Sequence, residues 1–350
     1  MSVYSWIARL SPCDNLASFE NDKHSTTMDM LTLVISAAPR WHGMDVLTAT
    51  QFTREHLEDI FQVSSVMKTT IENGETVPDL LRGCVLGNVF YEPSTRTRAS
   101  FEAAAYRLGA NVINISASES SVTKGETLQD TMRCIECYTD VLVLRHPKVG
   151  AAQEVWPYLR KPLISAGDGS GEHPTQALLD YFTIMSELGR IDGLTIAILG
   201  DLKHGRTVHS LCRLLCKFKD ITLILISPHG LELPENVYLD IVRHCKVVRA
   251  AVSALNKVVR TADVLYVTRL QQERFATEEE YDKVRGSYVI DSSLMKEAQK
   301  SMIVMHPLPR RGEIKETVDS DPRCVYFKQM TNGMYVRMAL LSLIAGRAEH

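Results

Sequence analysis

The sequence predicts an α/β protein with two doubly wound parallel-sheet domains, and three observations support this prediction. The chain has 350 residues, which is more than a single hydrophobic core usually organises. Short apolar runs rich in β-branched residues alternate with helical stretches, as in parallel sheets that are covered by helices on both faces. These runs fall into two sets along the chain, so we expect two domains.

The predicted strands have clear bounds in the sequence. The first set covers residues 84–90, 111–116, 140–145 and 162–166. The second set covers residues 194–200, 222–227, 263–268, 288–291 and 302–306. Their nearly continuous apolar character is typical of strands buried on both faces.

Helical stretches connect and close the two strand sets. The stretch 173–189 connects them, because a new strand set begins after Gly193. The last stretch, 332–346, has no strand after it, and we predict that it packs back onto the first domain. The expected regions are an extension at 1–40, a first domain at 41–183 with the C-terminal helix 331–350, and a second domain at 184–330.

The composition argues against several classes of protein. Hydrophobic residues make up 45% and charged residues 23%, as in ordinary soluble globular proteins. The formal net charge of -3 gives no support to nucleic-acid or membrane binding driven by bulk electrostatics. The longest apolar runs, such as residues 32–39, are too short to span a bilayer.

Residues 1–40 show no clear periodicity, which favours a poorly ordered extension. The N-terminus lacks the basic start and continuous apolar stretch of a secretory signal. Asp14, Glu20 and Asp22 argue against a transit peptide, so the cytoplasm is the expected compartment.

The 8 cysteines fit that compartment. Cys134 and Cys137 form one close pair and Cys212 and Cys216 another, both in helical stretches. Small apolar side chains on buried helical faces explain such pairs better than a metal site or a disulfide does. We therefore expect no metal and no cofactor.

Polar residues follow the predicted strands at their carboxyl ends, where open parallel sheets bind ligands. In the first set, the strand 84–90 is followed by YEPSTRTR and the strand 162–166 by GDGSGEHPTQ. In the second set, the strand 194–200 is followed by DLKHGRT and the strand 302–306 by PLPRRGE. The candidate sites therefore cluster where the fold is expected to place a ligand.

The segment STRTR at 94–98 lies at a predicted turn from strand to helix. A helix is expected to begin near Thr95, where Ser94 and Thr95 are suitable N-cap residues. Free N–H groups and the helix dipole attract anions at such a turn. Arg96 adds a planar guanidinium that matches two phosphate oxygens. The whole segment after a strand favours a phosphate site over a capped helix with solvated arginines.

The segment GDLKHGRT at 200–207 resembles the nucleotide-binding P-loop, with Arg206 in place of the motif's lysine. An arginine lacks the compact charge of that lysine and matches carboxylates equally well. No convincing acidic metal-binding partner accompanies the segment, so ATP or GTP binding is disfavoured.

Other segments have a structural and a functional interpretation. His173 and Gln176 stand at the start of the linking helix, where the dipole disfavours an imidazolium and leaves a neutral donor for a carbonyl. Lys124 alone is interpreted as a solvated surface lysine. In HPLPRRGE at 306–313, two prolines fix the backbone, so its carbonyls suit an amine, although a rigid turn between domains explains them too.

Seven segments together resemble the aspartate carbamoyltransferase family of pyrimidine synthesis. They are FYEPSTRTRASFE, KGET, LRHP, AGDGSGEHPTQALLDYFTI, GDLKHGRTVHS, YVTRLQQERF and VMHPLPRRGEI. They extend in the family's order from about Trp41 to about Gly346. The segments EHPTQ and DLKHGRTVHS are most similar to the eukaryotic type, here expected as a stand-alone catalytic chain. The resemblance implies an active site in the cleft between two domains and at a subunit interface.

The resemblance also implies a role for each matching position. Carbamoyl phosphate would be bound by Ser94, Thr95, Arg96, Thr97, Ser120, Lys124, Arg145, His173, Gln176, Pro307 and Leu308. Aspartate would be bound by Lys124, Arg206, Arg269 and Gln271. The catalytic residues would be Arg96, Thr97, Lys124, Arg145 and His173. In the family, Ser120 or the adjacent Ser121, together with Lys124, comes from the neighbouring subunit, which implies a homotrimer with shared active sites.

Three other functions compete with this interpretation. Ornithine carbamoyltransferases share the STRTR turn but carry HCLP and SMG motifs, whereas this chain has HPLP and no SMG. The assignment to P-loop-like nucleotide-binding proteins is weakened by Arg206, which replaces the lysine of that motif. An inactive scaffold is disfavoured because every matched catalytic position is filled.

Overall fold

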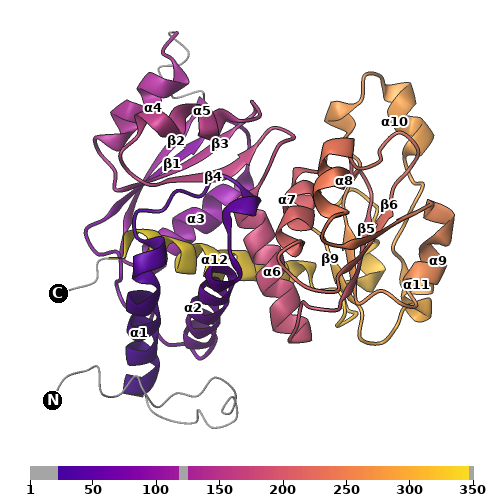
Figure 1. Ribbon diagram of the computed structural model, residues 1–350, viewed down its shortest axis with the longest axis horizontal. Helices are drawn as coiled ribbons and strands as arrows, with labels where there is room; N and C mark the ends of the chain where they lie inside the picture. The colour runs from indigo at the N-terminus through magenta and orange to yellow at the C-terminus, as the bar shows by residue number, and fades with distance from the viewer. Residues whose placement is uncertain (1–22, 118–124, 347–350) are drawn as a thin grey trace.

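The computed structural model describes residues 23–117 and 125–346 (Figure 1). In the first half of the chain, four parallel strands form a sheet in the order β2-β1-β3-β4. Their bounds are β1 Val85–Phe90, β2 Asn111–Ser116, β3 Val141–His146 and β4 Leu163–Asp168. The helices of this half are α1 Lys23–Trp41, α2 Arg54–Glu72, α3 Thr95–Arg107, α4 Leu128–Glu136 and α5 Ala151–Val155.

The second half contains a five-stranded parallel sheet in the order β7-β6-β5-β8-β9. Its strands are β5 Thr195–Leu199, β6 Thr222–Ile226, β7 Lys246–Ala250, β8 Val264–Val267 and β9 Ile303–Met305. Its helices are α7 Arg206–Leu215, α8 Glu235–Ile241, α9 Leu255–Val258, α10 Glu278–Val284 and α11 Ser292–Glu297. The predicted fold class of two parallel-sheet α/β units is confirmed.

Two strand predictions differ from the structure. Residues 288–291 form no strand, and Ile290 makes only an isolated bridge to Ile314. Their apolar character instead reflects burial, since Tyr288 and Ile290 are both buried in the core. Conversely, β7 was not predicted, because it is a short edge strand whose Lys246 is exposed to solvent.

The prediction that residues 1–40 form a poorly ordered extension is wrong for the part that the structure describes. Helix α1 buries Met30, Val34, Ala37 and Trp41, which follow one another at helical spacing. It packs against α2, and the Trp41 indole N–H donates to Asp59 of α2 at 2.9 Å. This segment is therefore part of the first core.

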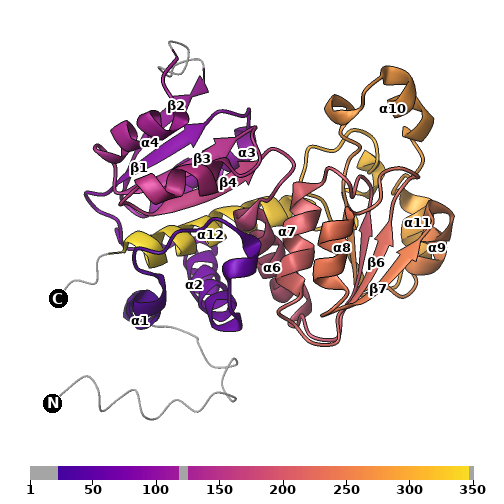
Figure 2. The same ribbon diagram turned by 45° about the horizontal axis from the view of Figure 1, so that its top comes forward.

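Two helices join the halves. Helix α6, Pro174–Leu188, follows β4 and precedes β5, so the predicted boundary at residues 183 and 184 falls inside it. Helix α12, Tyr326–Ala345, contacts β9 of the second sheet and also α2, α3 and α6 (Figure 2). The last helix thus spans both units.

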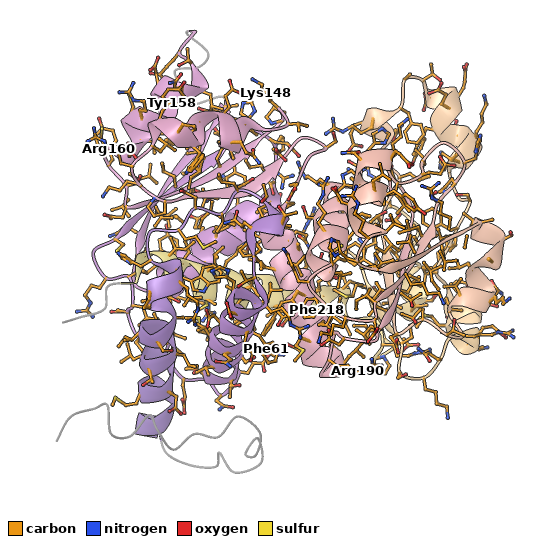
Figure 3. All side chains as sticks on the ribbon, in the orientation of Figure 1. Phe61, Lys148, Tyr158, Arg160, Arg190 and Phe218 are labelled. Atoms are coloured by element: carbon orange, nitrogen blue, oxygen red, sulfur yellow. The ribbon has the colours of Figure 1, made fainter. Side chains whose placement is uncertain are left out.

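Aromatic side chains strengthen this junction. Phe182 of α6 contacts Phe61 of α2 with ring centroids 5.7 Å apart, and Tyr181 of α6 stacks on Phe218 at 5.6 Å. Figure 3 labels Phe61 and Phe218 beside α6. One continuous hydrophobic cluster accordingly extends through both halves, which fixes the strand ends of the two sheets relative to each other.

Candidate active site

A cavity of about 1080 Å³ lies between the two sheets. Segments that follow β1, β3, β4, β5, β8 and β9 contribute to its wall, as expected for the carboxyl ends of parallel strands. Every predicted site residue that the structure describes lines it: Ser94, Thr95, Arg96, Thr97, Arg145, His173, Gln176, Arg206, Arg269, Gln271, Pro307 and Leu308. Ser120 and Lys124 lie outside the described residues.

The turn after β1 presents the start of α3 to the cavity. Helix α3 begins at Thr95, as predicted, and Ser94 is its extended N-cap residue. The Ser94 side chain makes no capping hydrogen bond, so its hydroxyl and the first N–H groups of the helix can serve a ligand. Arg96 donates to the carbonyl oxygen of Leu308 at 2.9 Å. Burial and then the charge of Arg269 lower the pKa of Arg96, which marks a concentration of positive charge.

Glu92 is central to this cavity, although the sequence analysis gave it no role. Its carboxylate accepts from Arg145 Nη2 at 2.7 Å and from Arg206 Nη1 and Nη2 at 3.0 and 2.7 Å. Burial acts to raise the pKa of Glu92, but its hydrogen bond and charge interaction with Arg206, together with Arg145, outweigh burial and lower it. Glu92 is therefore an ionised counter-charge between two arginines.

Arg145 is buried at the end of β3, with 8% of its surface exposed. Its pKa falls to about 10, chiefly through burial and then through the charge of Arg206. Its Nε atom has no hydrogen-bond partner among the described residues. Even at this pKa the guanidinium is charged at neutral pH, so the site holds a desolvated cation.

His173 is the N-cap residue of α6 and is buried. Burial, followed by the charges of Arg145, Arg206 and Arg337, lowers the pKa of its imidazole well below the ordinary value. Desolvation and three arginine charges therefore favour the neutral imidazole, which the sequence analysis predicted from the helix dipole alone. Gly167 allows this crowding, because a Cβ there would lie 3.3 Å from both Arg206 and His173.

The second half of the chain contributes two further groups. Arg269 follows β8 and pairs with Glu273, which is the largest cause of its raised pKa. The Leu308 N–H donates to His306 Nδ1 at 2.8 Å, and His306 Nε2 lies 2.8 Å from Glu313. These bonds hold the backbone around Pro307 and Leu308 beside the cavity.

Comparisons with known proteins agree with this geometry. The carbamoyl-phosphate-binding domain of aspartate/ornithine carbamoyltransferases matches residues 44–186, and the aspartate/ornithine-binding domain matches residues 192–344. The chain belongs to the aspartate/ornithine carbamoyltransferase family. It is 50% identical to the aspartate carbamoyltransferase catalytic subunit of Thermoplasma acidophilum over 83% of this chain and 95% of that one.

Solved structures and longer proteins also resemble this carbamoyltransferase chain. Aspartate transcarbamoylase of Trypanosoma cruzi in complex with carbamoyl phosphate and aspartate has a TM-score of 0.84 and 42% identity, covering 88% of this chain and 98% of that one. The multifunctional protein CAD of Squalus acanthias is 47% identical over 87% of this chain, which spans 14% of that protein's length.

This carbamoyltransferase chain has one more buried cation at the site. Arg337 of α12 lines the same cavity, is 3% exposed, and has a pKa lowered to about 9, chiefly by burial and then by Arg145. Its Nη2 atom lies 3.5 Å from Thr175 Oγ1, and its Nε has no partner among the described residues. The only sequence signal for it was an arginine within the apolar second half of the last helix.

Proposed function

We propose that this chain is an aspartate carbamoyltransferase. It transfers the carbamoyl group of carbamoyl phosphate to the amine of L-aspartate, giving N-carbamoyl-L-aspartate and phosphate, an early step of pyrimidine synthesis. The supporting observation is that arginines from both sheets line one cavity, Arg96 and Arg145 from the first and Arg206 and Arg269 from the second. Such a cavity suits a phosphate beside a dicarboxylate.

Carbamoyl phosphate occupies the first-sheet side in this proposal. The hydroxyls and N–H groups of the Ser94–Thr97 turn hold its phosphate at the start of α3. Thr97, Arg145 and His173 surround its carbonyl oxygen, where donors stabilise the negative charge that develops during attack. Gln176 contacts the carbamoyl NH2, with the backbone of Pro307 and Leu308 nearby.

Aspartate occupies the second-sheet side, with Arg206, Arg269 and Gln271 at its carboxylates. Its own amine attacks the carbamoyl carbon, so no protein nucleophile is required. The bond from that carbon to the phosphate oxygen breaks, and the departing phosphate accepts the amine proton. Catalysis arises from holding two substrates in contact and from stabilising the developing charges.

The active enzyme in this proposal is a homotrimer in which Ser120 and Lys124 enter a neighbouring site. Several large apolar side chains of the first half are exposed, among them Ile113 on the edge strand β2, Tyr106 on α3 and Tyr138 after α4, with 38%, 56% and 71% of their surfaces exposed. Contact with a neighbouring subunit would cover side chains of this kind. No helix in the described part of the chain is long and apolar enough to cross a membrane, and the cytoplasmic location stays a prediction.

Incubation with carbamoyl phosphate and aspartate tests the function. Formation of N-carbamoyl-L-aspartate and phosphate in equal amounts is the expected result, measured by mass spectrometry and phosphate release. Citrulline formation from ornithine, without reaction of aspartate, would instead assign the chain to the ornithine branch of the family. ATP hydrolysis without either product would favour the P-loop-like function.

A further inference from the structure

Asp180 is a fully buried carboxylate behind the cavity, one helical turn after Gln176 on α6. Its Oδ1 atom accepts from Gln176 Nε2 at 2.9 Å and from Gln329 Nε2 at 2.6 Å. Its Oδ2 atom accepts from the Tyr266 hydroxyl at 2.8 Å. Three donors from α6, α12 and β8 thus converge on one side chain that does not itself line the cavity.

The backbone fixes the direction of this hydrogen-bond network. The His306 N–H is always a donor, and it donates to Gln329 Oε1 at 2.9 Å. The Gln329 amide must therefore direct its NH2 group toward Asp180. Burial raises the pKa of Asp180 to about 7. Because Oδ1 accepts from Gln329, a proton on the carboxyl group would lie on Oδ2, so Oδ1 is an acceptor and the NH2 group of Gln176 must point toward it as well. The remaining amide atom of Gln176, Oε1, is left for the cavity.

We propose that Asp180 is a positioning residue that holds the Gln176 amide with its carbonyl oxygen toward the carbamoyl NH2 group of the substrate. This inference rests on the proposed function. Through Gln329, the same carboxylate is linked to His306, which immediately precedes the Pro307–Leu308 carbonyls. Asp180 therefore connects the two groups that accept from the carbamoyl NH2, the Gln176 amide and the Pro307–Leu308 backbone. In this way it sets the preference for a carbamoyl over an acetyl group.

Acetyl phosphate is the probe for this role, because it replaces the carbamoyl NH2 with a methyl group and leaves the phosphate unchanged. The measured quantity is the ratio of the dissociation constants of acetyl phosphate and carbamoyl phosphate, obtained by calorimetry. Asp180→Leu keeps the branching at Cγ but has no acceptor, so the Gln176 amide is free to turn. We expect this ratio to fall about 10-fold, as for one lost hydrogen bond to a substrate group.

Two variants separate positioning from general destabilisation. Asp180→Asn keeps one oxygen for both glutamine donors, and it is expected to retain the wild-type ratio within about threefold. Thr183→Val removes a buried hydrogen bond between α6 and α12, which Asn332 donates at 3.1 Å. It is expected to lower the thermal midpoint while leaving the ratio unchanged. Asp180→Ala replaces Asp180→Leu if the latter does not fold.

A combined variant tests the route through Gln176. Adding Asp180→Leu to Gln176→Ala should change the ratio by less than about threefold, because Gln176, the one residue at the substrate that Asp180 contacts directly, is already gone. An unchanged ratio in folded Asp180→Leu or Asp180→Ala overturns the proposal, and so does a lost preference in folded Asp180→Asn. A wild-type chain that forms no N-carbamoyl-L-aspartate refutes the proposed function instead, which keeps the two failures distinguishable.

Discussion

Glu92 and Arg206 join the two halves of the molecule by a bidentate ion pair, with Nη1–Oε2 and Nη2–Oε1 distances of 3.0 and 2.7 Å. Glu92 follows β1 of the first sheet, and Arg206 begins α7 of the second. Because Arg145 also donates to Glu92, one carboxylate orients a guanidinium assigned to each substrate. The relative position of the two substrates therefore depends on this group.

Glu92→Gln is expected to lower kcat about 10-fold, because a neutral amide with one oxygen cannot accept both bonds of the bidentate pair with Arg206 and offers no charge to either arginine, so the two substrates lose alignment. Steady-state kinetics with both substrates measures this effect. Glu154→Gln is a matched control, since Glu154 pairs with Lys148 on the surface, and its kcat should remain at the wild-type value. A wild-type kcat in Glu92→Gln would refute the orienting role.

Arg337→Met should weaken carbamoyl phosphate binding and increase stability together. The buried guanidinium has no ion-pair partner among the described residues, so removing it relieves a desolvation cost. The same change deprives the anionic substrate of a counter-charge, and we expect its dissociation constant to rise about 10-fold. Calorimetry and thermal unfolding measure the two effects, and an unchanged affinity would contradict the binding role.

The stability of the chain should fall in acid partly because of His173. Its pKa in the folded state is depressed well below 6.5, whereas the unfolded imidazole gains a proton as the pH falls through 6.5. The unfolded state then binds more protons, so the stability that His173 contributes is lost as the pH falls below about 6.5. Urea unfolding at pH 7, 6 and 5 should show wild type losing more stability than His173→Gln. Equal losses at every pH would argue against a neutral, buried His173.

Shared active sites can be tested with two inactive chains. Arg96→Ala lacks the phosphate-binding arginine, and Lys124→Ala lacks the group assigned to the neighbour's site. Equal mixing by denaturation and refolding should restore activity at roughly one quarter of the sites. An active site needs an intact Arg96 from one chain and an intact Lys124 from the neighbouring chain, and each condition is met at about half of the sites. Each variant refolded alone is the control. No recovery in mixtures of confirmed trimer mass would count against sharing.

Local signals explain what the sequence predicts well. The turn at Ser94–Thr97 depends on a strand, a cap and a helix start within one short segment, and α3 begins at Thr95 as expected. The buried strands are recognisable because both their faces are apolar. By contrast, β7 is a short and partly solvated edge strand, and α1 spaces its buried residues among exposed ones such as Ile35.

The residues that sequence analysis missed act through contacts distant in the chain. Glu92 is 114 positions from Arg206, and Gln329 is 149 positions from Asp180. Nothing within either local segment indicates these partners. Arg337 and Asp180 also lie in largely apolar helices, where the role of a charged residue can be recognised only after its burial and its contacts are known.

The most direct test of the central claim is the ratio of kcat/KM for aspartate to that for ornithine, measured on the wild-type chain with saturating carbamoyl phosphate. Arg206 and Arg269 favour a dicarboxylate and repel the second amine of ornithine, so the ratio should exceed about 1,000, a discrimination within reach of buried polar contacts. A ratio at or below about one would contradict the assignment of this cavity to carbamoyl transfer onto aspartate.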